Sequence, residues 1–505
     1  MLTLIIFIPL LAALVLLLVN KDDTRTIRNI SVGAAGLTFL LSLALLLRFD
    51  SAQLGMQFTE NHAWVPMLHI NYQLGVDGIS LWLVVLTAFI SLIAVCFSLD
   101  RDVGFRNFMA LLLALEAGTL GVFLALDLIL FYVFWELMLV PTYFLIGIWG
   151  EGRRIYATTK FVLYTLVGSL FMLLGIIWLS LIHFEATHEL SFDIQTLVQM
   201  KIDPSTQVWL FLFFLSAFAI KIPIFPLHSW LPHAYIASPI PVLIILTGAM
   251  SKAGAYGIIR FCLPLFPDAV EKFGLVIAFG AAVGIIYGAW IAIAQRDLKA
   301  LVAYSSISHL GFIVLGIFSF NSEGIEGSLL QMVNHGIIAS ALFIIVGILE
   351  KKMGTRNLDD FRGLGKSMPL LYGIFMLITL AALGLPGLSG FVGEFLILLG
   401  VWTSLLLADL SVIYVLMSGV AIIFAAIYML YMFQGAMQEK NEKIPEDLSD
   451  INSKEFGLLL PACILVVFIG LYPKIFIDRV APSVGSVLMV EKTINLDAGK
   501  GNDQH

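Results

Sequence analysis

The sequence predicts an all-α polytopic membrane protein with about fourteen transmembrane helices. The 505 residues are 60% hydrophobic and only 12% charged, whereas soluble domains are about half apolar and about a quarter charged. Apolar runs of about 20 residues, the length needed to cross a bilayer core, recur from one end of the chain to the other. The polar stretches between them are the size of loops, so we expect no soluble domain.

Each apolar run is assigned to one span, in chain order. The predicted spans are about 2–19, 27–48, 79–99, 106–125, 127–149, 155–183, 207–226, 239–262, 273–293, 299–319, 328–350, 368–405, 410–436 and 455–474. The first lacks the basic region and the cleavage site of a signal peptide, so we expect it to be retained. The stretches 49–78, 184–206 and 437–454 and the tail after 475 are of loop size, and the last residues, EKTINLDAGKGNDQH, are expected to be frayed.

Two of these spans contain residues that break helices. The seventh is interrupted by IPIFPLHSWLPHAY, with Pro223, Pro226 and Pro232, and the twelfth by GLPGLSG, from Gly384 to Gly390. The twelfth is also too long for one straight crossing. A broken helix is tolerated in a membrane only where protein or water satisfies the freed backbone groups. We therefore expect discontinuous helices 7 and 12.

The two breaks lie five spans apart, which suggests an internal repeat. If spans 4–8 and 9–13 are equivalent five-helix units, their odd number gives them opposite orientations, and inverted repeats with matching broken helices are typical of transporters. The predicted organisation is an N-terminal group of three spans (1–105), a first repeat (106–262), a second repeat (273–436) and a last span with the C-terminal tail (455–505).

The distribution of basic residues orients the chain. Of the 28 Lys and Arg residues, eighteen lie in loops after odd-numbered spans, eight lie in loops after even-numbered spans or in the tail, and two lie inside spans. Cytoplasmic loops carry the excess of Lys and Arg. This predicts that both termini lie on the outer, periplasmic side of the membrane.

Several function classes are excluded or disfavoured by composition. The net charge of −7 argues against a nucleic-acid partner. Cys96, Cys262 and Cys463 each stand alone in an apolar segment, which excludes a cysteine-ligated iron–sulfur or zinc site. His228 and His233 have no further metal ligands nearby in the sequence, so no metal site is expected there. The sequence contains no complete phosphate-binding loop. We expect neither a metal nor a cofactor in this chain.

The most informative residues are ionisable groups inside the predicted spans. Each costs about 3 kcal/mol or more in hydrocarbon, so such groups usually mark a proton or ion path. Six are the candidate catalytic residues: Glu136, Lys221, Lys252, His309, His335 and Glu394.

The first two candidates lie near the first break. Glu136 is in FYVFWELMLV of span five, and Lys221 is in FAIKIPIFP, just before the break in span seven. Lys221 is the best candidate for the cation that Glu136 needs, and a lysine in a hydrated pocket can load and unload a proton. The alternatives are a neutral, hydrogen-bonded Glu136 and a Lys221 that snorkels to the interface.

The other four candidates continue the series toward the second break. Lys252, in TGAMSKAGAYG, is too deep to snorkel easily, and its small neighbours admit close packing or water. His309 and His335 lie near the centres of their spans and titrate in the range that a relay needs. Glu394 follows the glycine-rich break in LPGLSGFVGEF. The alternatives are a structural Lys252, histidines that only pack in the core, and a Glu394 that caps the unwound turn.

A second tier of candidates carries weaker signals. Glu116 is at mid-span in LLALEAGTLG, and His228 and His233 lie within the first break. Asp127, Asp297 and Lys299 lie near span ends, where we expect a solvated face.

Five stretches between residues 130 and 400 resemble one known family. They are FWELMLVPTYFLIGIWG, KIPIFPLHSWLPHAYIASPIPVLIILTGAMSKAGAYGIIRF, QRDLKALVAYSSISHLGF, VNHGIIASALF and LPGLSGFVGEF. These are similar to the antiporter-like subunits of respiratory complex I and of the related multisubunit cation/proton antiporters. The block around the first break is highly specific to this family.

The resemblance implies a fold and a set of residue roles. It implies fourteen spans, two inverted repeats, a Glu136–Lys221 pair, a central Lys252, and histidines 309 and 335 leading to a terminal site at Glu394. Most members resemble one another in having lysine at that last site. Glutamate there is similar to the M-type branch, that of mitochondrial subunit four.

The resemblance also implies an activity and its setting. The expected function is proton translocation in the bacterial inner membrane, coupled to NADH-to-quinone electron transfer in other subunits of an NADH:quinone oxidoreductase. FMN and iron–sulfur clusters are expected on those other subunits, and the expected partners are L-type and N-type neighbours and the lipid bilayer. The alternatives are a subunit of a sodium/proton antiporter or of a membrane-bound hydrogenase, a stand-alone solute transporter, and a scaffold subunit.

Overall fold

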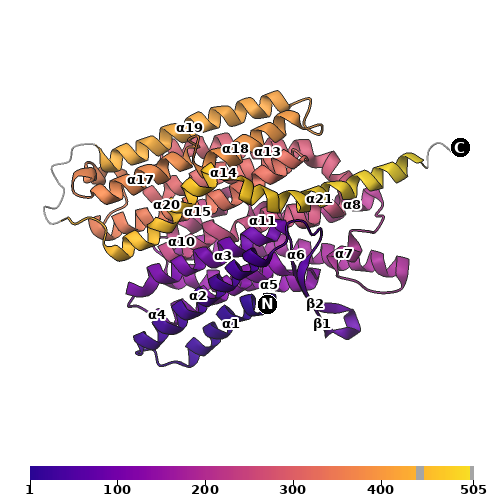
Figure 1. Cartoon of the computed structure of the whole chain (residues 1–505), viewed down its shortest axis with the longest axis horizontal. Helices are drawn as coiled ribbons and strands as arrows, with labels where there is room; N and C mark the ends of the chain where they lie inside the picture. The colour runs from indigo at the N-terminus through magenta and orange to yellow at the C-terminus, as the bar shows by residue number, and fades with distance from the viewer. Residues whose placement is uncertain (439–447, 501–505) are drawn as a thin grey trace.

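The computed structural model describes residues 1–438 and 448–500, with side chains described up to residue 489. Most helices run roughly along one axis, which is horizontal in Figure 1. The first three spans are α1 (Leu2–Leu18), α2 (Thr24–Arg48) and α3 (Gly78–Phe97). Between α2 and α3, β1 (Gln57–Val65) and β2 (Ile70–Val76) form an antiparallel hairpin joined by η1 (Pro66–Leu68).

The first predicted repeat forms five crossings. Its helices are α4 (Phe105–Leu124), α5 (Leu128–Trp149), α6 (Arg154–Thr187), the broken pair α8 (Pro204–Lys221) and α9 (Trp230–Ala237), and a composite span of α10 (Ile240–Ile245), η4 (Leu246–Met250), α11 (Lys252–Gly257), η5 (Ile258–Cys262) and α12 (Leu263–Leu265). η4 and η5 are π-helical. The connections include η2 (Ser98–Asp100), α7 (Ile194–Leu197) and η3 (Leu227–Ser229).

The second predicted repeat and the last span follow the same plan. The helices are α13 (Pro267–Ile293), α14 (Leu298–Ile317), α15 (Ser322–Met353), the broken pair α17 (Pro369–Ala382) and α18 (Ser389–Thr403), α19 (Ser411–Met437) and α20 (Ser453–Leu471). Two short helices, α16 (Leu358–Phe361) and η6 (Leu364–Lys366), precede α17. α21 (Lys474–Lys500) ends the described chain.

The number of crossings agrees with the prediction. Among the described residues, twelve helices are long and apolar enough to span a membrane, judged by length and composition. The shorter α1 and the broken pair α17–α18 supply the other two crossings. Both predicted discontinuities are confirmed, because α8 ends at Lys221 and α17 ends at Ala382.

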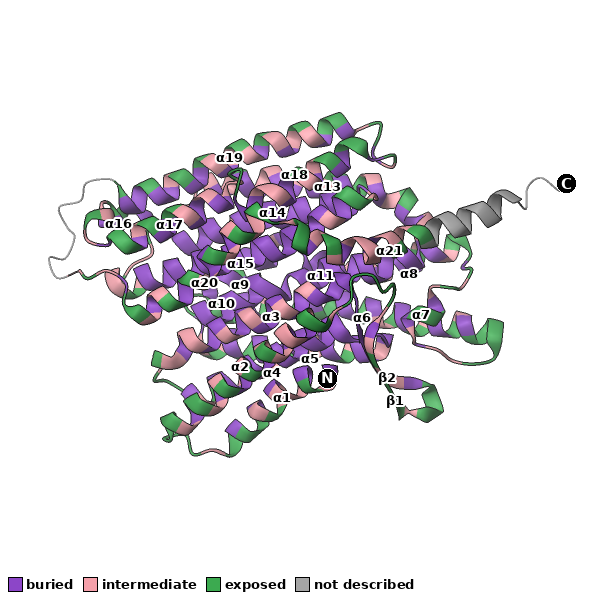
Figure 2. Cartoon of the chain, in the orientation of Figure 1, coloured by how far each residue is buried: buried purple, intermediate pink, exposed green. Residues whose placement is uncertain are grey.

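Two loop contacts repeat with opposite orientation, as inverted repeats require. Asp127 caps the N-terminus of α5 and forms a β-bridge with Asp193, at the start of α7. Asp297 caps the N-terminus of α14 and forms a β-bridge with Asn357, at the start of α16. Figure 2 places α7 and α16 at opposite ends of the molecule. Equivalent contacts at opposite ends are the pattern that two inverted five-helix units predict, and the division into these units stays a prediction.

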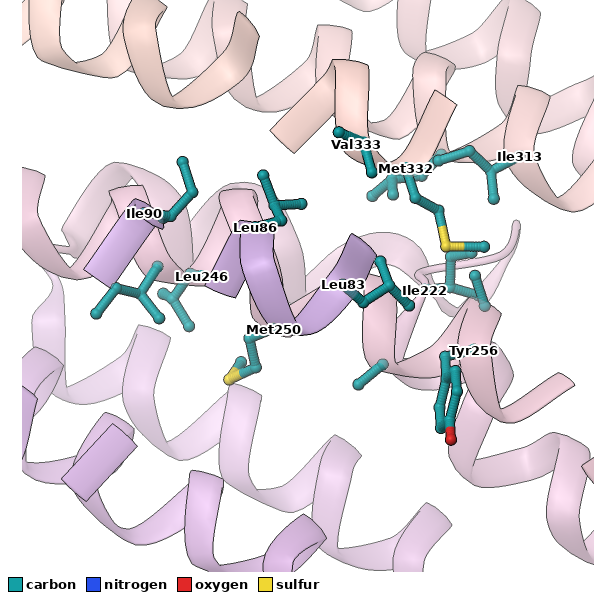
Figure 3. Packing of buried hydrophobic residues seen from close by; sticks show 14 of the residues in the cluster. Leu83, Leu86, Ile90, Ile222, Leu246, Met250, Tyr256, Ile313, Met332 and Val333 are labelled. Atoms are coloured by element: carbon teal, nitrogen blue, oxygen red, sulfur yellow. The ribbon is translucent and has the colours of Figure 1, made fainter. Parts of the chain in front are cut away.

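The centre of the molecule is formed by α15 and the composite span α10–α12. Both are completely buried over their most apolar windows, and Figure 2 shows the buried residues concentrated there. Leu86 and Ile90 of α3 pack beside Leu246 and Met250 of η4, and Val333 of α15 lies nearby (Figure 3). Helices that are buried all round can hold polar groups away from lipid, and these two carry Lys252 and His335.

Three regions predicted as loops contain regular structure, among them 184–206, which includes the short helix α7. The stretch 49–78 includes the hairpin β1–β2, which pairs with the main fold through a bridge from Leu74 to Ala125. The tail after 475, predicted to be of loop size, is helical as α21, which continues through 491–500, residues predicted to be frayed; residues 501–505 lie outside the described part. The reason for the first half of this helix is an apolar stripe: Phe476, Val480 and Val484, spaced by four, are all buried.

Close helix packing in the second repeat depends on glycine. A Cβ atom at Gly400 of α18 would lie 2.5 Å from Cα of Gly324 of α15, so Gly400→Leu must push the two helices apart. Overpacking of this kind costs about 1–3 kcal/mol, and we expect a lower Tm in thermal aggregation of the purified protein. Gly373→Leu on α17 is the matched control, because its Cβ meets nothing within 4 Å. An equal Tm for both variants would contradict this packing.

Candidate functional site

The first break ends at a buried lysine. Lys221 is the last residue of α8, and its side chain is 1% exposed. Its Nζ lies 5.3 Å from the centre of the Trp135 ring and 5.7 Å from that of Phe161. Aromatic faces attract a cation, and the C-terminal end of a helix does so as well. A lysine at the end of α8 can therefore carry a positive charge while its side chain stays buried in the protein.

Glu136 lies near Lys221 without forming an ion pair. It follows Trp135 on α5, and the ammonium group of Lys221 lies over the ring of that tryptophan. Among the described residues, however, no salt bridge within 4 Å joins the two, and Oε1 of Glu136 is buried without a hydrogen-bond partner. The structure thus places the predicted pair together but leaves its charged atoms apart.

The break itself is fixed by close contacts. Nε1 of Trp230 donates a hydrogen bond of 2.8 Å to the carbonyl oxygen of Ile220, which replaces a helical bond lost at the break. A Cβ atom at Gly254 of α11 would lie 2.6 Å from the carbonyl oxygen of Phe218 and 2.8 Å from the amide nitrogen of Ile222. Only glycine lets α11 lie directly on the end of α8, and this contact brings the segments of Lys221 and Lys252 together.

Lys252 is completely buried at the start of α11, directly after the π-helical segment η4. Its Nζ donates to the carbonyl oxygen of Thr247, lies 3.3 Å from Oγ of Ser251, and lies 2.8 Å from Nδ1 of His335. An ammonium group has three donors, so all three find partners. π-helical turns occur frequently at functional sites, and here the turn provides the carbonyl that holds the lysine.

His335 continues the line toward the second break. Its ring centre is 5.7 Å from that of His309, and its Nε2 has no hydrogen-bond partner in the described part of the chain. Nδ1 of His309 lies 3.2 Å from Oε1 of Glu394, although the angles do not make a hydrogen bond. A cavity of about 10 Å³ is lined by both histidines, Glu394 and Ser305. That is about the space of one water molecule.

Glu394 lies in the second turn of α18, just beyond the second break. Nε2 of Gln331 donates to its Oε1 over 3.4 Å. Gly384 has a positive φ of 74°, and a Cβ atom there would lie 2.8 Å from Oε2 of Glu394. The glycines of the break therefore do two things: they allow the left-handed turn, and they leave room for the carboxylate.

Three further polar residues near this end were missed by the sequence analysis. Gln331 and Asn334 share a face of α15 with His335, and Asn334 donates a hydrogen bond of 2.7 Å to the carbonyl oxygen of Ser389. Tyr428 of α19 is buried, and its hydroxyl has no hydrogen-bond partner among the described residues. Gln331 is three residues before Asn334 and four before His335, a spacing that places all three on one face of a helix. This pattern could have identified them from the sequence.

The second-tier candidates are not brought into contact with this line. Glu116 on α4 is buried, and neither of its carboxylate oxygens has a hydrogen-bond partner in the described part of the chain. His228 stacks on Phe225 with ring centres 5.3 Å apart. His233 is exposed, and its Nδ1 lies 2.8 Å from the carbonyl oxygen of Ser229. Among the described residues no cluster of three potential metal ligands is found.

The expectation of a solvated face was wrong for Asp127 and Lys299. Asp127 is buried as the N-cap of α5, and Lys299 is only 1% exposed. Lys299 lies 3.2 Å from both Glu151 and Glu350, in a network that also includes Arg356. This network ties the loop after α5 to the start of α14 and the end of α15, so it joins the two predicted repeats at one end of the molecule.

The arrangement consists of two polar groups of residues. One is the pair Glu136 and Lys221 beside the first break. The other is a nearly continuous line from Lys252 through His335 and His309 to Glu394. Every member of the line can bind and release a proton, and neighbouring members are in contact or separated by about one water. Proton transfer between fixed groups is the chemistry that such a line can perform.

The chain is similar to known membrane proteins over nearly its whole length. A family model described as "NADH:quinone oxidoreductase/Mrp antiporter, TM" matches residues 125–421. NADH-quinone oxidoreductase subunit M of Rhodobacter capsulatus is 38% identical over 503 residues, covering 97% of this chain and 96% of that protein. NADH-ubiquinone oxidoreductase chain 4 of Arabidopsis thaliana is 39% identical over 491 residues, with 96% of each chain covered.

A solved structure gives the same result. A chain in the structure of respiratory complex I from Thermus thermophilus with bound NADH superposes with a TM-score of 0.88. It is 31% identical in sequence, and the match covers 97% of this chain and 99% of that one.

The network around Lys299 gives a stability prediction. Lys299→Met leaves Glu151 and Glu350 without their shared buried cation. Because both carboxylates are partly exposed, we expect a loss of about 1–3 kcal/mol, between the values for exposed and fully buried ion pairs. The measurement is Tm of the purified protein. Lys201→Met is the control, because Lys201 is exposed and lies outside this network. If Lys299→Met melts like the control, the network does not hold the repeats together.

Proposed function

The chain belongs to the family of antiporter-like membrane subunits of NADH:quinone oxidoreductases and Mrp antiporters, and we propose how it works within it. Its close relatives are named subunit M or chain 4 of NADH:quinone oxidoreductase. It is accordingly a membrane subunit of that oxidoreductase complex, with proton translocation as its function. The observation that carries the mechanism is the line from Lys252 to Glu394.

The proton passes along the line in three transfers. Protonated Lys252 gives its proton to Nδ1 of His335, 2.8 Å away. His335 releases a proton from Nε2, which a water in the cavity carries to His309. His309 passes a proton to Oε1 of Glu394, 3.2 Å from its Nδ1. An imidazole that receives a proton on one nitrogen and releases one from the other ends as the second tautomer, so each histidine must reset before the next proton.

The pair at the first break supplies the driving change. Movement of the Glu136 carboxylate relative to Lys221 changes how well the lysine charge is stabilised, because the two are near but not bonded. A tenfold change in proton affinity corresponds to about 1.4 kcal/mol, so a change of a few kcal/mol reverses the direction of transfer. When the pair separates, Lys221 releases its proton toward Lys252. The energy for this movement comes from electron transfer in other subunits.

We propose the rest of the complex from the resemblance to the family. FMN and iron–sulfur clusters belong to other subunits; for the iron–sulfur clusters, this proposal is supported by the three cysteines of this chain, which lie apart as free thiols. The neighbours are the L-type and N-type antiporter-like subunits. The location is the bacterial inner membrane with both termini on the outer side, as the Lys and Arg distribution favours. Two residues in that count, Lys440 and Lys443, lie outside the described part of the structure.

Replacement of the central lysine tests the line directly. Lys252→Met keeps the approximate length of the side chain but removes the group that carries the proton. We expect proton pumping during NADH oxidation to fall by at least half in proteoliposomes that contain the assembled complex, measured with a pH-sensitive dye. Lys272→Met, at an exposed position, should pump normally. Full pumping by assembled Lys252→Met would instead favour a purely structural subunit.

Substitutions at the first break test the proposed role of the pair Glu136 and Lys221. Glu136→Gln and Lys221→Met should each lower pumping, and electron transfer should fall with it because the two processes are coupled. The rates of NADH oxidation and of proton uptake are measured on the same vesicles, in sodium-free and in sodium-containing buffer. Normal rates in both assembled variants would refute the role of the pair. A requirement for sodium would point to the sodium/proton antiporter alternative.

A further inference from the structure

A long apolar groove lies between α3 and α20, outside the polar line. Its volume is about 700 Å³. Val333 and Ile337 of α15 form part of its floor, and Phe89 of α3 and Leu465 of α20 belong to its sides. No charged side chain lines it in the described part of the chain. The groove is thus an apolar surface that something other than this chain must cover in the membrane.

The groove faces the hydrocarbon and extends along most of its thickness. On α20 it runs from Gly457 to Tyr472, a rise of about 22 Å along a helix, against about 30 Å for a bilayer core. On the same helix, Ile464 is 58% exposed and Phe468 is 44% exposed. Its position and direction are those of a lipid acyl chain.

The groove meets a charged pocket at the inner end of α20. This pocket has a volume of about 290 Å³, shares Leu458 with the groove, and is lined by Arg101, Lys351 and Lys454 around Asp100. Two other carboxylates at its edge, Glu151 and Glu455, are held by cations elsewhere: Lys299 and Arg356 bind the first, and Lys352 lies near the second. Because Lys299 and Arg356 also pair with Glu350, and Arg356 with Asp297, six cations face five carboxylates in this cluster, which leaves a surplus of one positive charge.

The surroundings of Arg101 indicate which kind of ligand this pocket binds. Its guanidinium lies 4.2 Å above the centre of the Phe108 ring, and its Nε is buried without a hydrogen-bond partner among the described residues. Lys351 and Lys454 both pair with Asp100, but no such pair is found for Arg101 in the described part of the chain. An anion with several oxygen acceptors, such as a phosphate, would satisfy it.

We propose that the groove and the pocket together form a binding site for one phospholipid with a net negative charge. The acyl chains lie in the groove along α20, and the phosphate lies at Arg101, Lys351 and Lys454. A helix of another subunit would fill an apolar groove as well, and the cross-linking measurement below distinguishes it from a lipid. An amphiphile with one anionic end matches both parts.

The position of the site gives the lipid a role. α15 lies between the groove and the polar line, because Val333 and Ile337 face the groove while His335 contacts Lys252. Leu86, in the groove wall, packs against Gly336, where a Cβ atom would lie 2.8 Å from its Cδ2. An acyl chain in the groove keeps water from this side of α15 and seals the proton line from the membrane.

Filling the groove tests the acyl-chain part of the site. Gly457 lines the groove, and a Cβ atom there meets nothing within 4 Å, so Gly457→Phe occupies the space without a clash in this chain. Gly419→Phe on α19 is the matched control, because it is equally open and does not line the groove. Native mass spectrometry of the detergent-purified complex should show one retained phospholipid fewer for Gly457→Phe than for Gly419→Phe. Equal lipid retention in the two variants would overturn the proposal.

A second measurement uses the unchanged complex and does not depend on a variant that assembles. The complex is placed in vesicles of phosphatidylethanolamine and phosphatidylglycerol that carry a trace of photoactivatable phosphatidylglycerol. Labelling is expected on peptides covering 457–472, and Arg101→Gln should lower it about fivefold, the effect of one basic residue near an anionic surface. Equal labelling by a photoactivatable phosphatidylethanolamine would overturn the preference for an anionic lipid. Absence of labelling, with a neighbouring helix cross-linked there instead, would overturn the site.

Discussion

The structure depends on one constraint: a charge buried in the membrane must find all of its partners inside the protein. Lys252 shows how this is met. Its ammonium group is held by the Thr247 carbonyl of a π-helical turn, by Ser251 and by His335. Regular helices offer no free carbonyl at mid-membrane, so the irregular turn is what allows a lysine at the centre of the molecule.

The two broken helices meet the same constraint at either end. At the first, α8 stops at Lys221, and Trp230 binds the carbonyl freed by the break. At the second, Asn334 donates a hydrogen bond to the carbonyl oxygen of Ser389, the first residue of α18. Glycine makes both arrangements possible, because Gly254 lets one helix lie on the first break and Gly384 leaves space for the carboxylate at the second. The ordered polar line is thus a result of how the backbone is interrupted.

Much of this was predictable from the sequence, for a physical reason. Long apolar runs and helix breakers define the spans and the breaks, and the cost of burying charge singles out residues such as Lys252 and Glu394. Distances were not predictable, because hydropathy does not fix how a helix is tilted or rotated. Hence the separation of Glu136 from Lys221, and the contact of Lys252 with His335, appear only in the structure. α21 was missed because its apolar stripe is narrow compared with a span, although Phe476 and Val480 mark it.

The central claim is that protons cross through the line from Lys252 to Glu394. The most direct test is a structure of the assembled complex at a resolution that shows ordered water. The account predicts a water between His335 and His309 in the small cavity, and further waters joining Lys221 to Lys252. A dry, closely packed gap at either place, in every state of the enzyme, would contradict it.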